Sequence, residues 1–372
     1  MNFSALARFL EELVSRGIPG ADIAIMQDHK LLFRGHAGWR DREAGTALNG
    51  DELYYVYSCT KLATVVSALQ LYEKGAFLLS DPLYAYLPEY RNMYVRLPNG
   101  SVTQAHDPIL LRHLFTMTAG MSYALDAPSI LAARAADPRC PTRAIVRALA
   151  AEPLLFEPGE NWAYSLAHDV LGGLIEVLSG KKLSQYMQEN LFEPLGMSRT
   201  GFYRSSGDEE RFAAQYRFFE ENGRAERILL ANDYVFGPGY ESGGAGLISC
   251  VDDYIRFADA LACGGVAWNG HRILSGTTID MLRQNQLNAR QIAAFGKPGY
   301  GYGLGVRTAI DRASGGLLCP MGTFGWEGAG GAYISIDREN RLSFYYAQHM
   351  RNHQGRHIHP RLVNVVYACL DR

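Results

Sequence analysis

The sequence has no long hydrophobic run and no surplus of charge of either sign. With 36 Lys and Arg against 38 Asp and Glu, its formal net charge is −2, so neither a nucleic acid nor a membrane surface is predicted as a partner. No stretch of about 18 apolar residues occurs, and we predict no membrane span. The apolar residues of segment 3–13 are interrupted by charges, unlike the core of a signal peptide, and we predict a cytoplasmic protein.

Cysteine is scarce and scattered, which argues against disulfides and metal sites. The six cysteines include no C-x-x-C pair and no metal-ligand spacing, so we predict reduced, mostly buried thiols. Four histidines gather near the C-terminus, but arginines lie among them and no acidic or cysteine ligand has a firm spacing. We therefore predict no metal and no cofactor. These histidines are His349, His353, His357 and His359, with Arg351 and Arg356 among them.

Internal repeats, low-complexity tracts and the composition of a disordered chain are absent as well. Hydrophobic residues make up 48% of the chain and charged residues 20%, so the 372 residues are expected to fold around a sizeable core. Tyrosine is the most frequent aromatic residue, with 22 against 16 Phe and 4 Trp. Its ring buries well while its hydroxyl stays available, so this excess hints at a polar cleft.

Strand patterns occur at both ends of the chain, and helical patterns fill the middle. Apolar runs at 22–26 and 31–38 flank a turn at 28–30, and runs at 332–336 and 342–347 flank another at 337–340. We predict an α+β fold whose antiparallel sheet and flanking helices come from both ends. Residues 1–80 and 233–372 would form this part, residues 81–232 a mainly helical subdomain, and the active site would lie between them. The predicted helices are 61–73, 109–117, 142–151, 168–178, 183–191 and 360–370.

The first chemical motif is Ser58-Cys59-Thr60-Lys61, an S-x-x-K at the start of the predicted helix 61–73. Residues three apart on a helix face the same way, so Lys61 can reach the Ser58 hydroxyl. The helix dipole and burial both disfavour a charge on Lys61, which favours the neutral amine. Since a neutral lysine can act as a general base, the pair indicates a nucleophilic serine.

Two further segments carry aromatic residues and glycines. Residues 156–165, FEPGENWAYS, place a Pro-Gly turn before Trp162 and Tyr164, at the start of a helix. Residues 325–331, GWEGAGG, lie just before the strand at 332–336. Their glycines allow the backbone to approach a ligand closely, and free amides at a strand edge suit an oxyanion hole.

Together these motifs resemble the serine hydrolases of the β-lactamase family, in the branch of class C β-lactamases, D-amino-acid peptidases and family VIII carboxylesterases. The likeness runs through segments 57–61, 79–82, 86–89, 113–121, 156–165, 192–197, 243–247 and 302–305. It implies a β-lactamase/transpeptidase-like fold, Ser58 as nucleophile of an acyl-enzyme, and Lys61 and Tyr164 as the base pair. It also implies an oxyanion hole made by the amides of Ser58 and Ala329.

The sequence departs from the β-lactamases of this branch at two positions that bind substrate. Leu166 stands where an Asn usually binds the substrate amide, and Trp326 stands where a Lys usually attracts a carboxylate. A charge-assisted contact of that kind contributes about 1.5–3 kcal/mol, and Trp cannot make it. We therefore predict a small neutral ester as substrate, or a small amide. The predicted substrate-binding residues are Trp326, Glu327, Gly328, Met121, Tyr123, Tyr240 and Tyr302.

Several alternatives stay open at this point. The enzyme could be a D-amino-acid amidase or peptidase with weak β-lactamase activity, and an acceptor other than water is possible. A catalytically silent binding or sensor protein is disfavoured, because Ser58, Lys61 and Tyr164 are present together. His168 and Asp169 suggest a Ser–His–Asp relay, but the chain has no G-x-S-x-G elbow, so we predict a structural role for them. Glu327 could touch substrate or face solvent.

Overall fold

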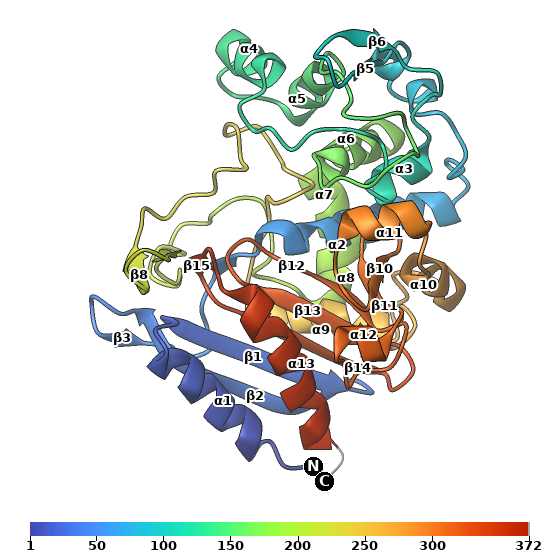
Figure 1. Cartoon of the computed structure of the whole chain (residues 1–372). Coiled ribbons are helices and arrows are strands. Elements are labelled where there is room, and N and C mark those ends of the chain that lie inside the picture. Colours follow the sequence, from blue (N-terminus) through green and yellow to red (C-terminus); the bar gives the residue numbers. More distant parts are fainter. Residues whose placement is uncertain (371–372) are drawn as a thin grey trace.

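The computed structural model describes residues 1–370 and is built around one antiparallel sheet (Figure 1). Its strands are β1 (Gly20–Gln27), β2 (Lys30–Asp41), β3 (Thr46–Ala47), β10 (Tyr300–Tyr302), β11 (Arg307–Ala309), β12 (Phe324–Glu327), β13 (Tyr333–Asp337) and β14 (Leu342–Ala347). Their order across the sheet is β10-β11-β12-β13-β14-β1-β2-β3. The two ends of the chain meet at its centre, where Asp22 of β1 pairs with Ala347 of β14. The predicted α+β fold with a sheet built from both ends is confirmed.

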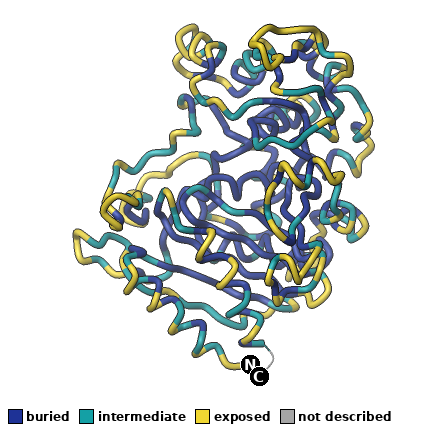
Figure 2. Tube along the Cα trace, in the orientation of Figure 1, coloured by how far each residue is buried: buried dark blue, intermediate teal, exposed yellow. Residues whose placement is uncertain are grey.

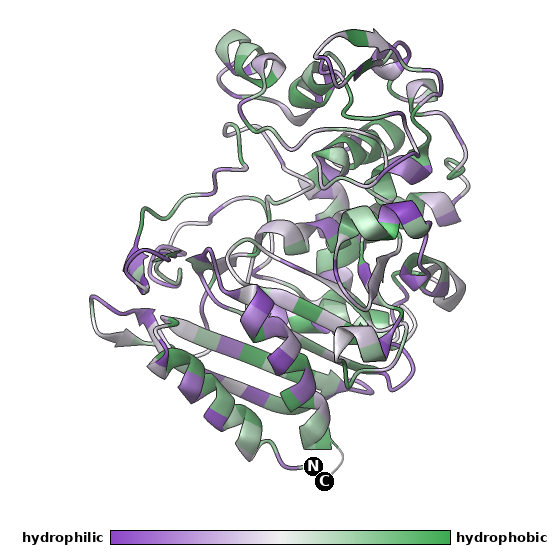
Figure 3. Cartoon of the chain, in the orientation of Figure 1, coloured by the Kyte–Doolittle hydropathy of each residue, from purple (hydrophilic) through white to green (hydrophobic). Residues whose placement is uncertain are grey.

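Helices cover both faces of this sheet. They are α1 (Ser4–Ser15) and α13 (Gly355–Leu370) on one face, and α2 (Thr60–Glu73) and α9 (Val251–Ala262) on the other. Because side chains of a strand alternate, Ile23 and Ile25 pack with α1 and α13, whereas Ala24 and Met26 pack with α2 and α9. Strand β1 is accordingly buried on both sides (Figure 2). Helix α1 carries alternating hydrophobic and hydrophilic stretches, as a covering helix should (Figure 3).

A mainly helical region lies beyond the α2 side of the sheet (Figure 1). It contains α3 (Leu111–Phe115), α4 (Pro128–Ala136), α5 (Thr142–Leu149), α6 (Ala167–Ser179), α7 (Leu183–Met187), a π-helical turn (Gln188–Phe192) and α8 (Glu193–Leu195), with a small pair of strands, β5 (Tyr94–Arg96) and β6 (Val102–Gln104). Helix α2 packs against α6, so it lies between the sheet and the helical region. The boundaries assigned to this region from the sequence, residues 81 and 232, stay predictions.

Apart from two 3-10 turns at Leu83–Ala85 and Pro88–Tyr90, the remaining elements lie around the sheet and the start of α2. They are β4 (Tyr54–Tyr55), a 3-10 turn (Tyr57–Cys59), β7 (Tyr216–Phe219), β8 (Arg224–Arg227), β9 (Ile248–Ser249), α10 (Gly276–Arg283), α11 (Ala289–Phe295), α12 (Arg312–Gly315) and β15 (Met350–Arg351). Strand β15 pairs in parallel with β7, which pairs with β8. None of the helices within residues 1–370 has both the length and the apolar character that a bilayer crossing demands.

Candidate active site

The 3-10 turn that precedes α2 holds Ser58 in a constrained position. Tyr57, the residue before it, has a backbone φ of +47°, in the left-handed region that a bulky residue rarely adopts. Such a conformation costs about 1–3 kcal/mol and persists only where surrounding contacts hold it. Here the Tyr57 hydroxyl accepts a hydrogen bond from Gln215 and donates one to the Ala231 carbonyl at 3.2 Å. The Arg351 guanidinium also lies 5.1 Å from the Tyr57 ring centroid. Ser58 therefore has little freedom to move.

Lys61 lies one helical turn after Ser58 and is fully buried. Its Nζ lies 3.3 Å from Ser58 Oγ and donates to the Gly244 carbonyl oxygen at 2.8 Å. The same Nζ lies 4.6 Å from the ring centroid of Tyr164 and 5.6 Å from that of Tyr123. The amine is thus fixed between one carbonyl, two aromatic rings and the serine hydroxyl.

Tyr164 reaches the same serine from the loop before α6. Its hydroxyl donates to Ser58 Oγ at 2.7 Å. The loop is tied to the chain after α3, because the Ala163 amide donates to the Met117 carbonyl at 3.0 Å and the Leu166 amide to the Ser122 carbonyl at 3.2 Å. Three residues predicted from the sequence as catalytic, at positions 58, 61 and 164, therefore meet at one oxygen atom.

The glycine-rich turn between β12 and β13 lies against the start of the 3-10 turn. A Cβ atom added at Gly328 would come within 2.3 Å of the Val56 carbonyl oxygen, and one added at Gly330 within 3.1 Å of the Tyr57 ring. At position 328 only glycine permits this approach. Ala329 lies between the two glycines, and neither its amide nor that of Ser58 has a backbone acceptor among residues 1–370. The turn that carries the Ala329 amide thus lies against the two residues before Ser58, and both amides are without a backbone acceptor in the described chain.

Trp326 on β12 forms an aromatic wall beside these groups. Its ring stacks on Tyr164 with centroids 5.8 Å apart, and its Nε1 lies 3.5 Å from the Tyr164 hydroxyl oxygen. Tyr302 packs edge-on against the indole at 5.2 Å, and Phe295 lies behind at 6.5 Å. The surroundings of Tyr164 on this side are therefore apolar and uncharged.

Glu327, predicted as a substrate-binding residue, faces the other way. It follows Trp326 on β12, and adjacent residues of a strand project to opposite faces. Its carboxylate pairs with Arg307 at 3.2 Å, His359 at 3.1 Å and Lys297 at 3.4 Å. The Glu327 carboxylate is therefore engaged by three basic side chains on the face of β12 away from Trp326, and its contact with substrate stays a prediction.

The predicted cleft residues differ in where they lie. Tyr123 is half-buried, with its ring 4.9 Å from that of Tyr164, so it stands next to the serine. Met121 is 8% exposed and packs in the main hydrophobic core. Tyr240 and Tyr302 are 3% and 0% exposed. Neighbouring aromatic and polar groups cover both rings, so they support the site from behind, and their contact with substrate stays a prediction.

Asp169 and His168 do not contact Ser58; Asp169 organises the segment that holds Lys61. Its buried Oδ1 accepts hydrogen bonds from the Tyr240 hydroxyl at 2.7 Å, the Ser242 hydroxyl at 2.6 Å and the Gly244 amide at 3.2 Å. The carbonyl of that same glycine accepts from Lys61. Burial lowers the pKa of His168 to about 3, so this ring is neutral, and its Nε2 lies 3.4 Å from the Phe115 carbonyl oxygen.

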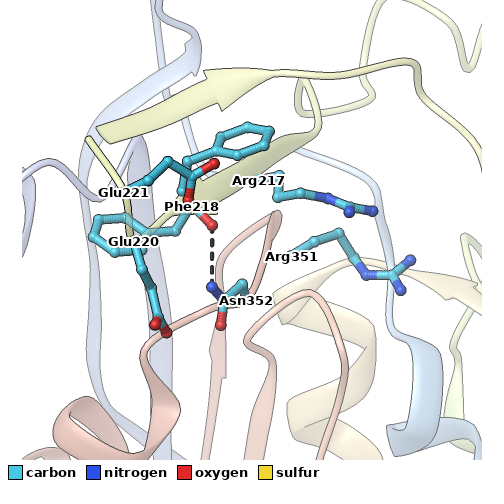
Figure 4. Close-up of a pocket in the computed structure, with 7 residues that line it drawn as sticks. Arg217, Phe218, Glu220, Glu221, Arg351 and Asn352 are labelled. Atoms are coloured by element: carbon cyan, nitrogen blue, oxygen red, sulfur yellow. Dashed lines mark hydrogen bonds between the residues drawn. The ribbon is translucent and has the colours of Figure 1, made fainter. Parts of the chain in front are cut away.

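Sequence patterns gave no indication of two residues beside the site, Tyr234 and Arg351. The Tyr234 ring lies 5.8 Å from Tyr57 and 5.9 Å from Tyr123, and its hydroxyl accepts from Arg351 at 3.3 Å. Arg351 of β15 lies opposite Arg217 of β7 in the parallel strand pair. The side chains of both arginines border an open cavity of about 560 Å³ (Figure 4). A long-range pairing of strands brings these groups together, and no local motif encodes it.

Several candidate metal ligands already contact other protein groups. His349 Nδ1 lies 2.8 Å from the Ala213 carbonyl oxygen, away from the other histidines of its cluster. One further group among residues 1–370, formed by His29, Asp259 and Cys263, has ligand atoms within 4.8 Å of one another. Here His29 pairs with Asp259 at 2.7 Å. Cys59, beside the serine, is fully buried, and burial raises the pKa of its thiol, so it is not an activated thiol.

Comparison with known proteins assigns the chain to a family. The Beta-lactamase family model matches residues 6–367. Protein Rv1367c of Mycobacterium tuberculosis is 32% identical over 363 residues, covering 93% of this chain and 90% of that protein. Esterase EstB of Burkholderia gladioli is 31% identical over 360 residues, covering 91% and 87%. The solved structure of EstCE1, described as a hydrolase with promiscuous acyltransferase activity, superposes with a TM-score of 0.81 at 25% identity, covering 98% of this chain and 97% of that one.

The fold and the match along almost the whole chain define a serine hydrolase. The chain belongs to the β-lactamase family, and the resemblance found in its sequence is confirmed. It is an enzyme of this class, as predicted.

Proposed function

We propose that the enzyme is an esterase that acts through an acyl-Ser58 intermediate on small neutral esters. The observation that carries the proposal is the convergence of the Tyr164 hydroxyl, at 2.7 Å, and Lys61 Nζ, at 3.3 Å, on Ser58 Oγ. A serine hydroxyl is a weak nucleophile, and it needs a base within hydrogen-bond reach. Both candidate bases are within that reach here.

In the proposed mechanism, Tyr164 and Lys61 act as one proton-transfer pair. As Ser58 Oγ attacks the ester carbonyl carbon, the pair takes its proton, and the carbonyl oxygen becomes an oxyanion held by the amides of Ser58 and Ala329. Collapse of this intermediate breaks the bond to the alcohol oxygen, which receives the proton back from the pair. Water then attacks the acyl-enzyme by the reverse route and releases the acid.

The substrate class follows from the wall formed by Trp326. An apolar, stacked indole in contact with Tyr164 favours an uncharged, apolar group of the substrate. It offers no cation to the carboxylate of a penicillin or of a peptide terminus. Esters with small apolar acyl groups are therefore the proposed substrates. The resemblance of the chain to Esterase EstB, at 31% identity, supports the same class.

Labelling tests the nucleophile. A fluorophosphonate probe followed by intact-mass analysis should add one label to the wild type and none to Ser58→Ala. Ser101→Ala, which changes an exposed serine, is the matched control and should be labelled like the wild type. An unlabelled wild type would favour a catalytically silent protein, and equal labelling of Ser58→Ala would remove Ser58 as the nucleophile.

A substrate panel then separates the alternatives within the enzyme class. Short-chain aryl esters should be turned over faster than D-amino-acid amides or a cephalosporin such as nitrocefin. Faster turnover of the cephalosporin would contradict the substrate class and leave the acyl-serine chemistry in place. Addition of an alcohol to the ester assay shows whether the acyl group passes to an acceptor other than water, because a transferred acyl group appears as a new ester.

A further inference from the structure

A second cavity lies on the face of β12 opposite to Trp326. It has a volume of about 490 Å³ and is formed by β10–β13, the chain after α11, and the first turns of α13. Its walls combine apolar and aromatic residues with several cations. The lining groups used below are Phe295, Tyr300, Leu317 and Tyr333 among the apolar ones, and Lys297, Arg307, Arg356 and His359 among the basic ones.

Arg307 gives this cavity a buried positive charge. Its side chain is only 8% exposed, and its guanidinium lies between the rings of Tyr300, at 4.8 Å, and Tyr333, at 5.2 Å. A guanidinium held between two aromatic faces is fixed in direction and poorly hydrated. Among residues 1–370, Glu327 is its ion-pair partner, through a single contact at 3.2 Å.

Glu327 cannot neutralise the cations around it. Its carboxylate is shared by Arg307, Lys297 and His359, and Arg356 lines the cavity with no ion pair of its own in the described chain. Burial alone would raise the pKa of Glu327, but the surrounding cations, Arg307 first among them, hold it well below its usual value. Three permanent cations therefore face one carboxylate, and the cavity keeps a net positive charge.

We infer that this cavity is a binding site for a small organic carboxylate with an apolar body. The carboxylate would be held by Lys297 and Arg356 at the rim and by the buried charge of Arg307. The apolar part would lie against Phe295, Tyr300 and Leu317. This size and this mixture of apolar walls with a few charged groups suit a small-molecule site. The inference concerns a site separate from Ser58 and does not depend on the proposed esterase chemistry.

Calorimetric titration of the full chain with phenylacetate tests the site, with phenylacetamide as a neutral probe of the same shape. Phenylacetate should bind roughly tenfold or more tightly than the amide at constant ionic strength. The double variant Lys297→Met/Arg356→Met should weaken phenylacetate binding by a similar factor, because both cations are at the rim and their loss leaves the core intact. The double variant Arg8→Met/Lys30→Met, which removes two exposed cations elsewhere, is the matched control and should bind like the wild type.

Two further titrations test where phenylacetate binds. Glu327→Gln removes the competing negative charge and should tighten phenylacetate binding several-fold. Ser58→Ala, and wild type whose Ser58 carries the fluorophosphonate label, should bind phenylacetate unchanged. The inference is overturned if no heat is seen up to about 20 mM phenylacetate, a limit that corresponds to negligible affinity. Equal binding of acid and amide, an unaffected Lys297→Met/Arg356→Met variant, or loss of binding when Ser58 is blocked would overturn it as well.

Discussion

The two faces of strand β12 have opposite characters, although they are formed by consecutive residues. Trp326 faces α2 and the proposed nucleophile Ser58, within an apolar, uncharged group of rings. Glu327 faces α13, within a cluster of arginine, lysine and histidine. The difference shows that consecutive residues of one short strand can border two different environments, which we propose to be two separate sites. Substitutions on one face should change catalysis, and substitutions on the other should change anion binding and stability.

The largest effect is expected at the serine itself. Ser58→Ala removes the attacking oxygen, and kcat for a short aryl ester should fall by roughly 10⁴-fold or more. Steady-state kinetics measures it, with circular dichroism to show an unchanged fold. A fall of less than about tenfold would mean that the chemistry on the Trp326 face of β12 does not run through this oxygen.

Loss of one proton carrier should cost less than loss of the nucleophile. Tyr164→Phe keeps the ring that stacks on Trp326 but removes the hydroxyl 2.7 Å from Ser58 Oγ. General acid–base catalysis of this kind contributes about 10²–10⁴-fold, and kcat should drop by that factor. Tyr94→Phe, which changes an exposed tyrosine, is the matched control and should leave kcat unchanged. An active Tyr164→Phe would assign the proton transfer to Lys61 alone.

Asp169→Asn tests the support behind the catalytic face. Its carboxylate accepts three hydrogen bonds in a buried network, and bonds to a charged group contribute about 1.5–3 kcal/mol each. We expect a loss of about 2–4 kcal/mol in the free energy of unfolding, measured with urea. Asp280→Asn breaks an exposed ion pair with Arg283 and should change the free energy of unfolding by less than about 1 kcal/mol. Equal effects of the two would show that Asp169 is not a structural centre.

The comparison between the faces is sharpest with paired variants on β12. Trp326→Lys replaces the apolar wall with a charge, and kcat/KM for an aryl ester should fall roughly tenfold or more. Glu327→Gln, one residue away, should leave kcat/KM within about threefold of the wild type, because its side chain is on the other face. If Glu327→Gln impairs ester turnover as much as Trp326→Lys does, the two faces are not independent.

The smallest expected effect is a pH dependence of stability on the α13 face. The pKa of Glu327 in the folded protein lies well below its usual 4.5. A carboxyl group with a lowered folded-state pKa stabilises the fold above its unfolded pKa, and this contribution is lost as the pH falls through the folded value. Glu327→Gln should thus be about 1–2 kcal/mol less stable than the wild type near pH 7. The gap should narrow in acid, which urea unfolding at several pH values would check; a constant gap would contradict it.

How far the site could be predicted from sequence depends on how local its contacts are. Ser58 and Lys61 are one helical turn apart, so spacing alone predicts their contact. Tyr164 comes from a distant loop, and only the family resemblance linked it to them. The orientation of Glu327 stayed open in the sequence because β12, which is short and contains a glycine, was not predicted as a strand, so the alternation of its side chains was not applied.

The helices and strands also differ in how well local sequence patterns predict them. The long hairpin at residues 20–41 and helix α2 follow clear apolar periodicities and turn residues, and both were predicted close to their observed positions. Strands β10 and β11 have only three residues each, too few for a pattern to emerge. Helix α13 begins at Gly355, five residues before the predicted start at 360, and so contains Pro360 in its interior, where proline is usually disfavoured.

The junction of β1 with β14 has a consequence for how the chain is made. The two strands that form the middle of the sheet are translated at opposite ends of synthesis, so β1 has no partner on its β14 side until nearly the whole polypeptide has left the ribosome. Contacts between such distant segments form slowly, since a very long loop must close first. The nascent chain therefore carries an exposed, mostly apolar strand edge for most of its synthesis, a period in which aggregation competes with folding and chaperones can bind it.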